Sequence, residues 1–166
     1  MKGMIKQLFS SIIVAVTGSD ASILAAKYAI IMAKAYKCRL SAVYVVDMDT
    51  IAQLALHKIF VQEESQEYEK SLEVNGKRYL SFVEELAQAK GVKIEKEIRR
   101  GAVYTEILAA AEEREADLII LGGWEKDRNP REIISHFHRE IMINAKCSVM
   151  LVKEPNIDYI YKHAEA

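Results

Sequence analysis

Leu118-Ile119-Ile120-Leu121-Gly122-Gly123 is the stretch that decides how this chain folds. Four apolar residues end in two glycines, and the polar stretch Trp124–Pro130 follows. A short apolar run bounded by turn residues is typical of a strand buried on both faces of a sheet. The glycines either let the backbone approach a ligand or simply let the strand turn into its loop. Open parallel sheets bind ligands at the carboxyl ends of their strands, where the strand order reverses, so a small-molecule site is expected here.

Strands and helices alternate on both sides of this stretch. Apolar runs predict the strands, and apolar residues at helical spacing predict the helices. The predicted strands are Ser11–Thr17, Arg39–Asp47, Val92–Arg100, Asp117–Leu121 and Ser148–Lys153. The predicted helices are Ala21–Tyr36, Gln62–Lys90, Ala102–Glu115 and Arg131–Ala145. Strands that alternate with helices form a parallel sheet with helices on both faces, so we predict a doubly wound α/β domain.

Four segments add detail to this alternation. Val92–Arg100 alternates apolar and charged residues, which predicts an edge strand with one solvated face. Ile51–Val61 is apolar enough to pack, either as a lid over the site or as plain core, but its boundaries do not follow from the pattern. Asn75-Gly76 disfavours helix and predicts a kink in the long helix. The tail Glu154–Ala166 is too apolar to be a plain solvated tail.

Composition limits the classes of function. The 166 residues are 51% hydrophobic and 28% charged, which suits one domain, with a core at about 9–154 and a tail at 155–166. The net charge of −1 gives no electrostatic reason to expect a nucleic acid or an anionic membrane as partner. Cys38 and Cys147 lie far apart in sequence, so we expect neither a disulfide framework nor a zinc site. No apolar run reaches the roughly 18 residues of a membrane span, and we expect a cytoplasmic protein.

Several fragments of the chain resemble the universal stress protein family. The first is V-A-V-T-G-S-D-A-S at Val14–Ser22, and the second is V-Y-V-V-D at Val43–Asp47. A-D-L-I-I-L-G at Ala116–Gly122 and A-K-C-S-V-M-L-V-K at Ala145–Lys153 resemble the last two strands of the family, and the helix opening at Gly101–Ala111 also fits. The resemblance implies a Rossmann-like sheet of five strands in the order 3-2-1-4-5, a role in stress response, and a homodimer.

Members of this family that bind ATP carry G-x2-G-x9-G-[ST] after the fourth strand. The glycines allow backbone amides to reach the phosphates, and the hydroxyl adds a donor at a helix start. Here the same frame reads Gly122-x2-Glu125-x9-Ser135-His136. Glu125 would repel phosphate oxygens, and Ser135 adds a side chain where the backbone should approach. The aspartate of the first strand is Thr17, and the proline two residues before it is Ala15. The chain therefore resembles the branch that lacks the glycine motif and is not expected to hold ATP.

The candidate residues of this region have structural interpretations as well as functional ones. His136 and His138 are two residues apart, and side chains at that spacing point in different directions on a helix, so a metal pair is not expected. His136 lies near a helix start and would meet an anion if protonated. Trp124 either stacks on a base or, as we favour, packs over the core or the dimer seam. We find no nucleophile with a base nearby and no paired carboxylates, so we expect no enzyme.

Two functions follow as hypotheses. The first is a non-enzymatic dimeric stress-response module with a degenerate nucleotide site, no cofactor, and protein partners that the sequence does not identify. Its dimer interface would be the last strand, with Val149 and Leu151 on one face and Met150 and Val152 on the other, and the tail around Tyr159–Tyr161 extending the seam or swapping onto the partner.

The second hypothesis is an ATP/AMP-type nucleotide-binding switch, or a slow ATPase, with an altered loop. Another small ligand in the same cleft is a third possibility. The candidate pocket consists of Ala15, Thr17, Val45, Leu121, Gly122, Ser135 and His136. Open space between the first and fourth strands would favour a binding site, whereas an apolar last strand without such a cleft would favour the dimeric module.

Overall fold

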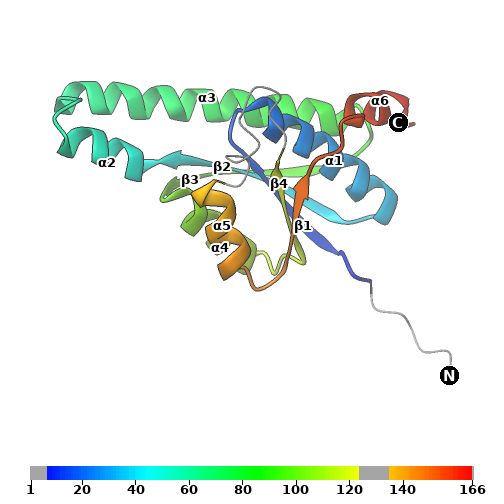
Figure 1. Ribbon diagram of the computed structural model, residues 1–166. Coiled ribbons are helices and arrows are strands. Elements are labelled where there is room, and N and C mark those ends of the chain that lie inside the picture. The colour runs from blue at the N-terminus through cyan, green and yellow to red at the C-terminus, as the bar shows by residue number, and fades with distance from the viewer. Residues whose placement is uncertain (1–6, 124–134, 166) are drawn as a thin grey trace.

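Five parallel strands form the sheet, in the order β3-β2-β1-β4-β5 (Figure 1). The computed structural model describes residues 7–123 and 135–165. The strands are β1 Ser11–Val16, β2 Arg39–Asp47, β3 Ile94–Gly101, β4 Leu118–Gly122 and β5 Ser148–Val152. The predicted fold class and strand order are confirmed.

Helices cover both faces of this sheet (Figure 1). They are α1 Asp20–Tyr36, α2 Met48–Leu56, α3 Gln62–Gln88, α4 Val103–Glu113, α5 His136–Asn144 and α6 Ile157–His163. Apolar residues of α1 and α3 form one core with one face of the sheet, and those of α4 and α5 form a second core with the other face. The apolar stripes predicted from helical spacing are the surfaces that these cores bury.

The strand order reverses at β1. This strand pairs with β2 on one side, where Val14 is opposite Ala42, and with β4 on the other, where Val14 is opposite Ile120. All six residues of β1 are buried, as expected for a β-branched run covered on both faces. The chain leaves β1 toward β2 and returns later to β4, so the connecting segments diverge above the carboxyl ends of β1 and β4. A cleft at this position is the usual ligand site of doubly wound sheets.

The long helix α3 runs unbroken through Gly76, so the predicted kink is wrong. The ring of Tyr44 lies 2.4 Å from the position that a Cβ on Gly76 would take. Gly76 therefore allows α3 to lie close to β2, and its cost in helix propensity is offset by this packing. Local propensity alone does not reveal such a contact.

The segment 51–61 resolves into the end of α2 and a turn that leads to α3. Asp47 caps α2, since its carboxylate accepts hydrogen bonds from the amide of Thr50 at 3.0 Å and from the Thr50 hydroxyl at 2.6 Å. Within α2 only Ile51 is buried. Together α2 and the first turns of α3 form a helical hairpin beside the sheet, at the left of Figure 1.

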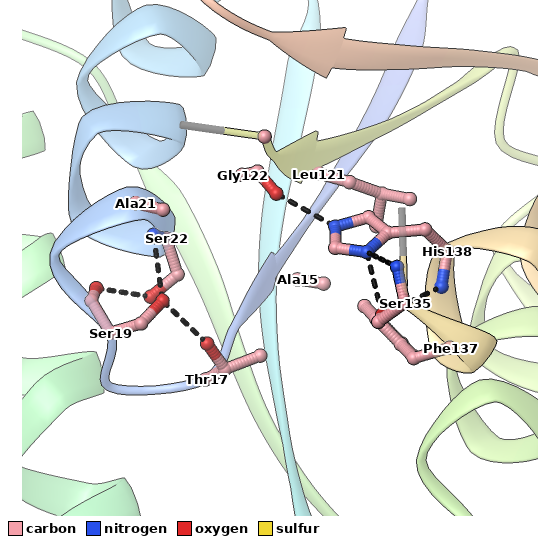
Figure 2. A pocket seen from close by; sticks show the side chains of 11 residues that line it. Ala15, Thr17, Ser19, Ala21, Ser22, Leu121, Gly122, Ser135, Phe137 and His138 are labelled. Atoms are coloured by element: carbon pink, nitrogen blue, oxygen red, sulfur yellow. Dashed lines mark hydrogen bonds between the residues drawn. The ribbon is translucent and has the colours of Figure 1, made fainter. Parts of the chain in front are cut away.

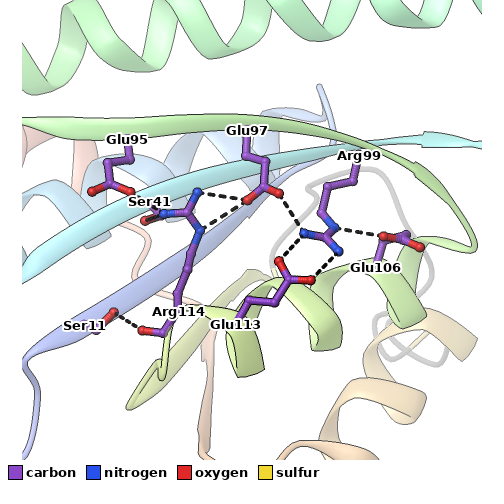
Figure 3. A network of polar contacts seen from close by, with 8 residues as sticks. All are labelled: Ser11, Ser41, Glu95, Glu97, Arg99, Glu106, Glu113 and Arg114. Atoms are coloured by element: carbon purple, nitrogen blue, oxygen red, sulfur yellow. Dashed lines mark hydrogen bonds and ion pairs between the residues drawn. The ribbon is translucent and has the colours of Figure 1, made fainter.

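The predicted edge strand β3 lies at the edge of the sheet, and its charged face carries a network of ion pairs to α4 (Figure 3). The Arg99 guanidinium contacts Glu97 at 2.7 Å, Glu106 at 2.8 Å and Glu113 at 2.8 Å. The adjacent Arg114 contacts Glu97 at 2.9 Å. Hydrogen bonds that Arg99 donates to the carboxylates of Glu113 and Glu106 raise the pKa of Arg99 further above its ordinary value, so this residue is a fixed cation. Charged side chains on an edge strand disfavour its pairing with a strand of another molecule.

The C-terminal tail folds back on its own chain as α6. Ile157 is buried against α1, and the Tyr161 hydroxyl donates a hydrogen bond to the Leu86 carbonyl at 2.6 Å. The Lys90 ammonium donates to the Ala164 carbonyl at 2.8 Å, and Lys27 pairs with Asp158 at 2.6 Å. Residues 157–164 are thus tied to α1 and the end of α3.

Among the described residues, no helix has both the length and the apolar character needed to cross a bilayer.

Candidate functional site

A cavity of about 320 Å³ lies at the carboxyl ends of β1 and β4 (Figure 2). This volume falls in the range of small-molecule sites, roughly 300–1,000 Å³. We call it the β1–β4 cavity. It is lined by Ala15, Thr17, Ser19, Ala21, Ser22, Leu121, Gly122, Gly123, Ser135, Phe137 and His138. The cavity is open space between the first and fourth strands, which was the feature expected of a binding site.

One wall of the cavity is the start of α1. The Ser19 hydroxyl caps this helix by accepting a hydrogen bond from the Ser22 amide at 3.1 Å, and the Thr17 hydroxyl lies 3.0 Å from it. Gly18 makes the turn with φ at +83°, and the Tyr79 ring lies 2.4 Å from where its Cβ would be. The first turn of α1, with the positive end of the helix dipole, therefore borders the cavity.

The opposite wall is the start of α5, where Ser135 caps the helix and His138 completes a capping box. His138 Nε2 lies 2.8 Å from the Gly122 carbonyl oxygen, and its Nδ1 lies 2.7 Å from the Ser135 hydroxyl. A carbonyl oxygen only accepts, so Nε2 carries the ring proton. The Ser135 amide donates to Nδ1 at 3.3 Å, so Nδ1 is the acceptor nitrogen of the ring in this arrangement. His138 joins the start of α5 to the end of β4.

Gly122 and Gly123 both line the cavity, and both also allow close packing. A Cβ on Gly122 would lie 2.5 Å from the Ala21 carbonyl oxygen, so β4 touches the backbone of α1 here. A Cβ on Gly123 would lie 2.4 Å from Cγ of Leu151. Each glycine thus has a structural role in addition to its place at the cavity.

Five of the seven residues predicted for the pocket line this cavity: Ala15, Thr17, Leu121, Gly122 and Ser135. The other two lie elsewhere. Val45 borders a second cavity of about 240 Å³, between β1, β2 and the helices α2, α3 and α4, which shares Ala15 and Thr17 with the first. We call it the β1–β2 cavity, and it is lined by Ala15, Val16, Thr17, Tyr44, Val45, Asp47, Thr50, Tyr68, Leu72, Val103 and Ile107.

His136 is the second exception, because its side chain is 75% exposed and packs edge-on against Tyr104. The structure brings His138 to the cavity instead. A signal for His138 exists in the sequence, since a residue three positions after an N-cap serine points back to the cap. Using this signal requires knowing that α5 begins after Ser135. Trp124 and Glu125 lie outside the described residues.

The chemistry offered by the β1–β4 cavity is hydrogen bonding from hydroxyls and helix-start amides. Among the described residues that line it there is no carboxylate, lysine, arginine or thiol. Ser135 and His138 are close enough to act as nucleophile and base, a pairing that the sequence had not indicated. However, the Ser135 hydroxyl accepts from the His138 amide at 3.3 Å, and the ring Nε2 faces a carbonyl and not a carboxylate. This arrangement is typical of a helix cap, and a carbonyl stabilises an imidazolium less than a carboxylate does. Within residues 7–123 and 135–165, no group of three potential metal ligands occurs.

The predicted dimer residues lie on β5, at the other edge of the sheet. Val149 and Leu151 contact the core under α4 and α5, whereas Met150 and Val152 contact the core under α1 and α3, so the predicted alternation is confirmed. Val152 is buried and the other three are half-buried.

Burial of Cys147, just before this strand, raises the pKa of its thiol, which is the behaviour of an unreactive cysteine.

Comparisons with known proteins agree with this architecture. The chain is 34% identical over 151 residues to the universal stress protein MJ0531 of Methanocaldococcus jannaschii, covering 90% of this chain and 85% of the relative. A universal stress protein solved in complex with cAMP superposes with a TM-score of 0.64 at 18% identity, over 88% of this chain and 98% of that one. One from Archaeoglobus fulgidus in complex with dAMP superposes with a TM-score of 0.60 at 17% identity, over 88% and 99%. The model of the universal stress protein family matches residues 9–153, and the chain belongs to this family.

Proposed function

We propose that this protein is a non-enzymatic stress-response module whose cleft binds a nucleotide with a single phosphate in preference to ATP. The observation that carries the proposal is the β1–β4 cavity, framed by the starts of α1 and α5. Two helix N-termini that face one cavity provide amide donors and positive dipole ends for an anionic group. The two family members solved with cAMP and dAMP carry nucleotides of this size, which supports the proposal.

We expect the two cavities to hold different parts of the nucleotide. The phosphate would lie in the β1–β4 cavity, and the base would lie in the β1–β2 cavity, near the rings of Tyr44 and Tyr68. Thr17 lines both cavities, so its hydroxyl would contact the ribose. A longer phosphate chain would need the space between β4 and α5, where Ser135 and His138 already bond to each other and to β4. For this reason ATP should bind more weakly than a monophosphate.

Titration calorimetry on protein freed of bound nucleotide tests this proposal. AMP or cAMP should bind with a dissociation constant of micromolar order, and ATP with magnesium should bind at least about tenfold more weakly. Thr17→Val keeps the side-chain shape but removes a hydroxyl, and should weaken monophosphate binding by about fivefold to tenfold, the loss of one hydrogen bond. Tighter binding of ATP, with release of phosphate, would replace the proposal with the slow-ATPase alternative.

A homodimer through β5 is the second part of the proposal. Its support is that β5 is an edge strand of the described sheet and carries half-buried apolar residues. Pairing two copies of β5 would satisfy the backbone groups of the edge and cover these side chains. Val149→Lys and Leu151→Lys should therefore convert a dimer to a monomer in light scattering. The same mass for wild type and variants would reject β5 as the interface.

A further inference from the structure

The helical hairpin of α2 and α3 ends in an apolar tip, residues 56–61. The tip carries three large apolar side chains in solvent: Leu56 is 78% exposed, Ile59 61% and Val61 63%. Single exposed apolar residues are common on protein surfaces, but a cluster of three at the end of a projecting hairpin is not. Figure 1 shows this hairpin beyond the β2 end of the sheet.

Backbone hydrogen bonds define the turn at this tip. The Ile59 amide donates to the Leu54 carbonyl at 3.0 Å, and the Lys58 amide donates to the Ala55 carbonyl at 3.1 Å. These two bonds are the 6→1 and 5→2 bonds of a Schellman motif that ends α2. The ring of Phe60 contacts the ring of Tyr68 of α3, with centroids 5.5 Å apart, and this contact holds the turn against the hairpin. The exposure of Ile59 is therefore a fixed property of the fold.

Lys58 occupies the position of this motif that glycine usually takes. Its φ is +55°, in the left-handed region, where a side chain costs free energy relative to glycine. The chain thus keeps a cation at the tip despite this cost, with His57 beside it. From Thr50 to Gln62 the sequence contains no acidic residue.

The first turns of α3 have the opposite charge. Glu63, Glu64 and Glu67 are all exposed, within two turns of the cationic tip. A two-fold contact between two hairpins would place the tip of one copy beside the start of α3 of the other, and each pair of contacts would occur twice. Lys58 would then meet the glutamates of the second copy, and the apolar side chains would meet at the centre. The same acidic residues disfavour an anionic membrane as the occupant.

We propose that the hairpin tip is a second self-association surface, and that its partner is the hairpin tip of another copy of this chain. It does not depend on the nucleotide site. Three apolar side chains are far fewer than the roughly 20–30 residues that each partner contributes to a stable interface. The contact is accordingly weak and depends on concentration. Because β5 and the hairpin lie at opposite edges of the sheet, the contact joins β5 dimers into larger assemblies.

Sedimentation velocity over about 5–500 µM protein tests this proposal. The mass of the wild type should rise with concentration, and Ile59→Glu should weaken the association by at least about tenfold. Ile59 is largely exposed, so the variant should fold normally, which circular dichroism and thermal melting will verify. Leu8→Glu is the matched control, since Leu8 is 80% exposed on a different part of the surface and its substitution should change nothing.

Charge exchange separates a direct contact from a nonspecific effect. Lys58→Glu should weaken the association, and adding Glu64→Lys to it should restore at least half of the loss in the logarithm of the dissociation constant. A wild-type mass that is constant up to 500 µM would overturn the proposal. So would equal effects of Ile59→Glu and Leu8→Glu, or an Ile59→Glu variant that loses binding to phospholipid vesicles while its self-association is unchanged.

Discussion

Replacement of Gly122 by alanine should destabilise the protein far more than replacement of its neighbour Gly123. The added Cβ of Gly122→Ala would lie 2.5 Å from the carbonyl oxygen of Ala21, which is backbone in the first turn of α1. Ordinary contacts of carbon lie near ~3.5 Å, so α1 and β4 would have to separate by roughly 1 Å. Both elements are buried in the core, and overpacking of this kind costs about 1–3 kcal/mol. We place Gly122→Ala near the upper end, at about 3 kcal/mol.

Gly123→Ala is the matched control. Its Cβ would be just as close to a neighbour, at 2.4 Å, but the neighbour is the half-buried side chain of Leu151, which can rotate away. We expect a loss of about 1 kcal/mol or less. Urea denaturation of both variants measures the free energies of unfolding. For a chain of this length the difference of about 2 kcal/mol corresponds to a melting temperature lower by about 4–8 °C. Equal losses for the two variants would refute the idea that backbone contact with α1 is the reason for Gly122.

Three further predictions concern other parts of the structure. His138→Ala removes the hydrogen bonds that join α5 to β4 and should lower the free energy of unfolding by about 1–3 kcal/mol in urea titration, whereas His136→Ala should change it little. A hydrogen bond from Arg99 lowers the pKa of the Glu113 carboxyl, so this pair stabilises the fold at neutral pH. The stabilisation disappears as the pH falls through that lowered pKa. In Glu113→Gln the free energy of unfolding should therefore decrease less steeply as the pH is lowered. Tyr161→Phe deletes the hydrogen bond that anchors α6 and should cost about 1 kcal/mol, measured by thermal melting.

The spacing of apolar residues and the composition of the chain were sufficient to predict the sheet and its helices. The strands are continuous apolar runs, and the helices carry clear apolar stripes. β2 occupies the predicted residues, and β1 differs from its prediction by one residue. The kink predicted at Gly76 failed for a physical reason. Helix propensity describes an isolated helix, whereas the contact between Gly76 and the Tyr44 ring joins segments more than 30 residues apart.

The sequence predicted residues of the candidate site that lie at strand ends, but it indicated the wrong histidine. Residues at the ends of β1 and β4 follow directly from the strand assignments, so Thr17 and Gly122 were found. The histidine depends on where α5 starts, since a shift of two residues turns a side chain by more than half a helical turn. His138 faces the cavity because Ser135 is the N-cap, and His136 consequently faces solvent. Val45 lies on the same face of the sheet as Ala15 and Leu121. It belongs to β2, which is separated from β4 by β1, so it borders the β1–β2 cavity instead.

Mapping of backbone amide shifts by two-dimensional NMR during titration with AMP tests nucleotide binding in this cleft most directly. The largest shifts should fall on two separate segments, Thr17 to Ser22 at the start of α1 and Ser135 to His138 at the start of α5, and they should saturate at micromolar AMP. ATP should produce the same pattern only at higher concentration. An absence of shifts at millimolar AMP, or shifts confined to residues away from both helix starts, would contradict the proposal.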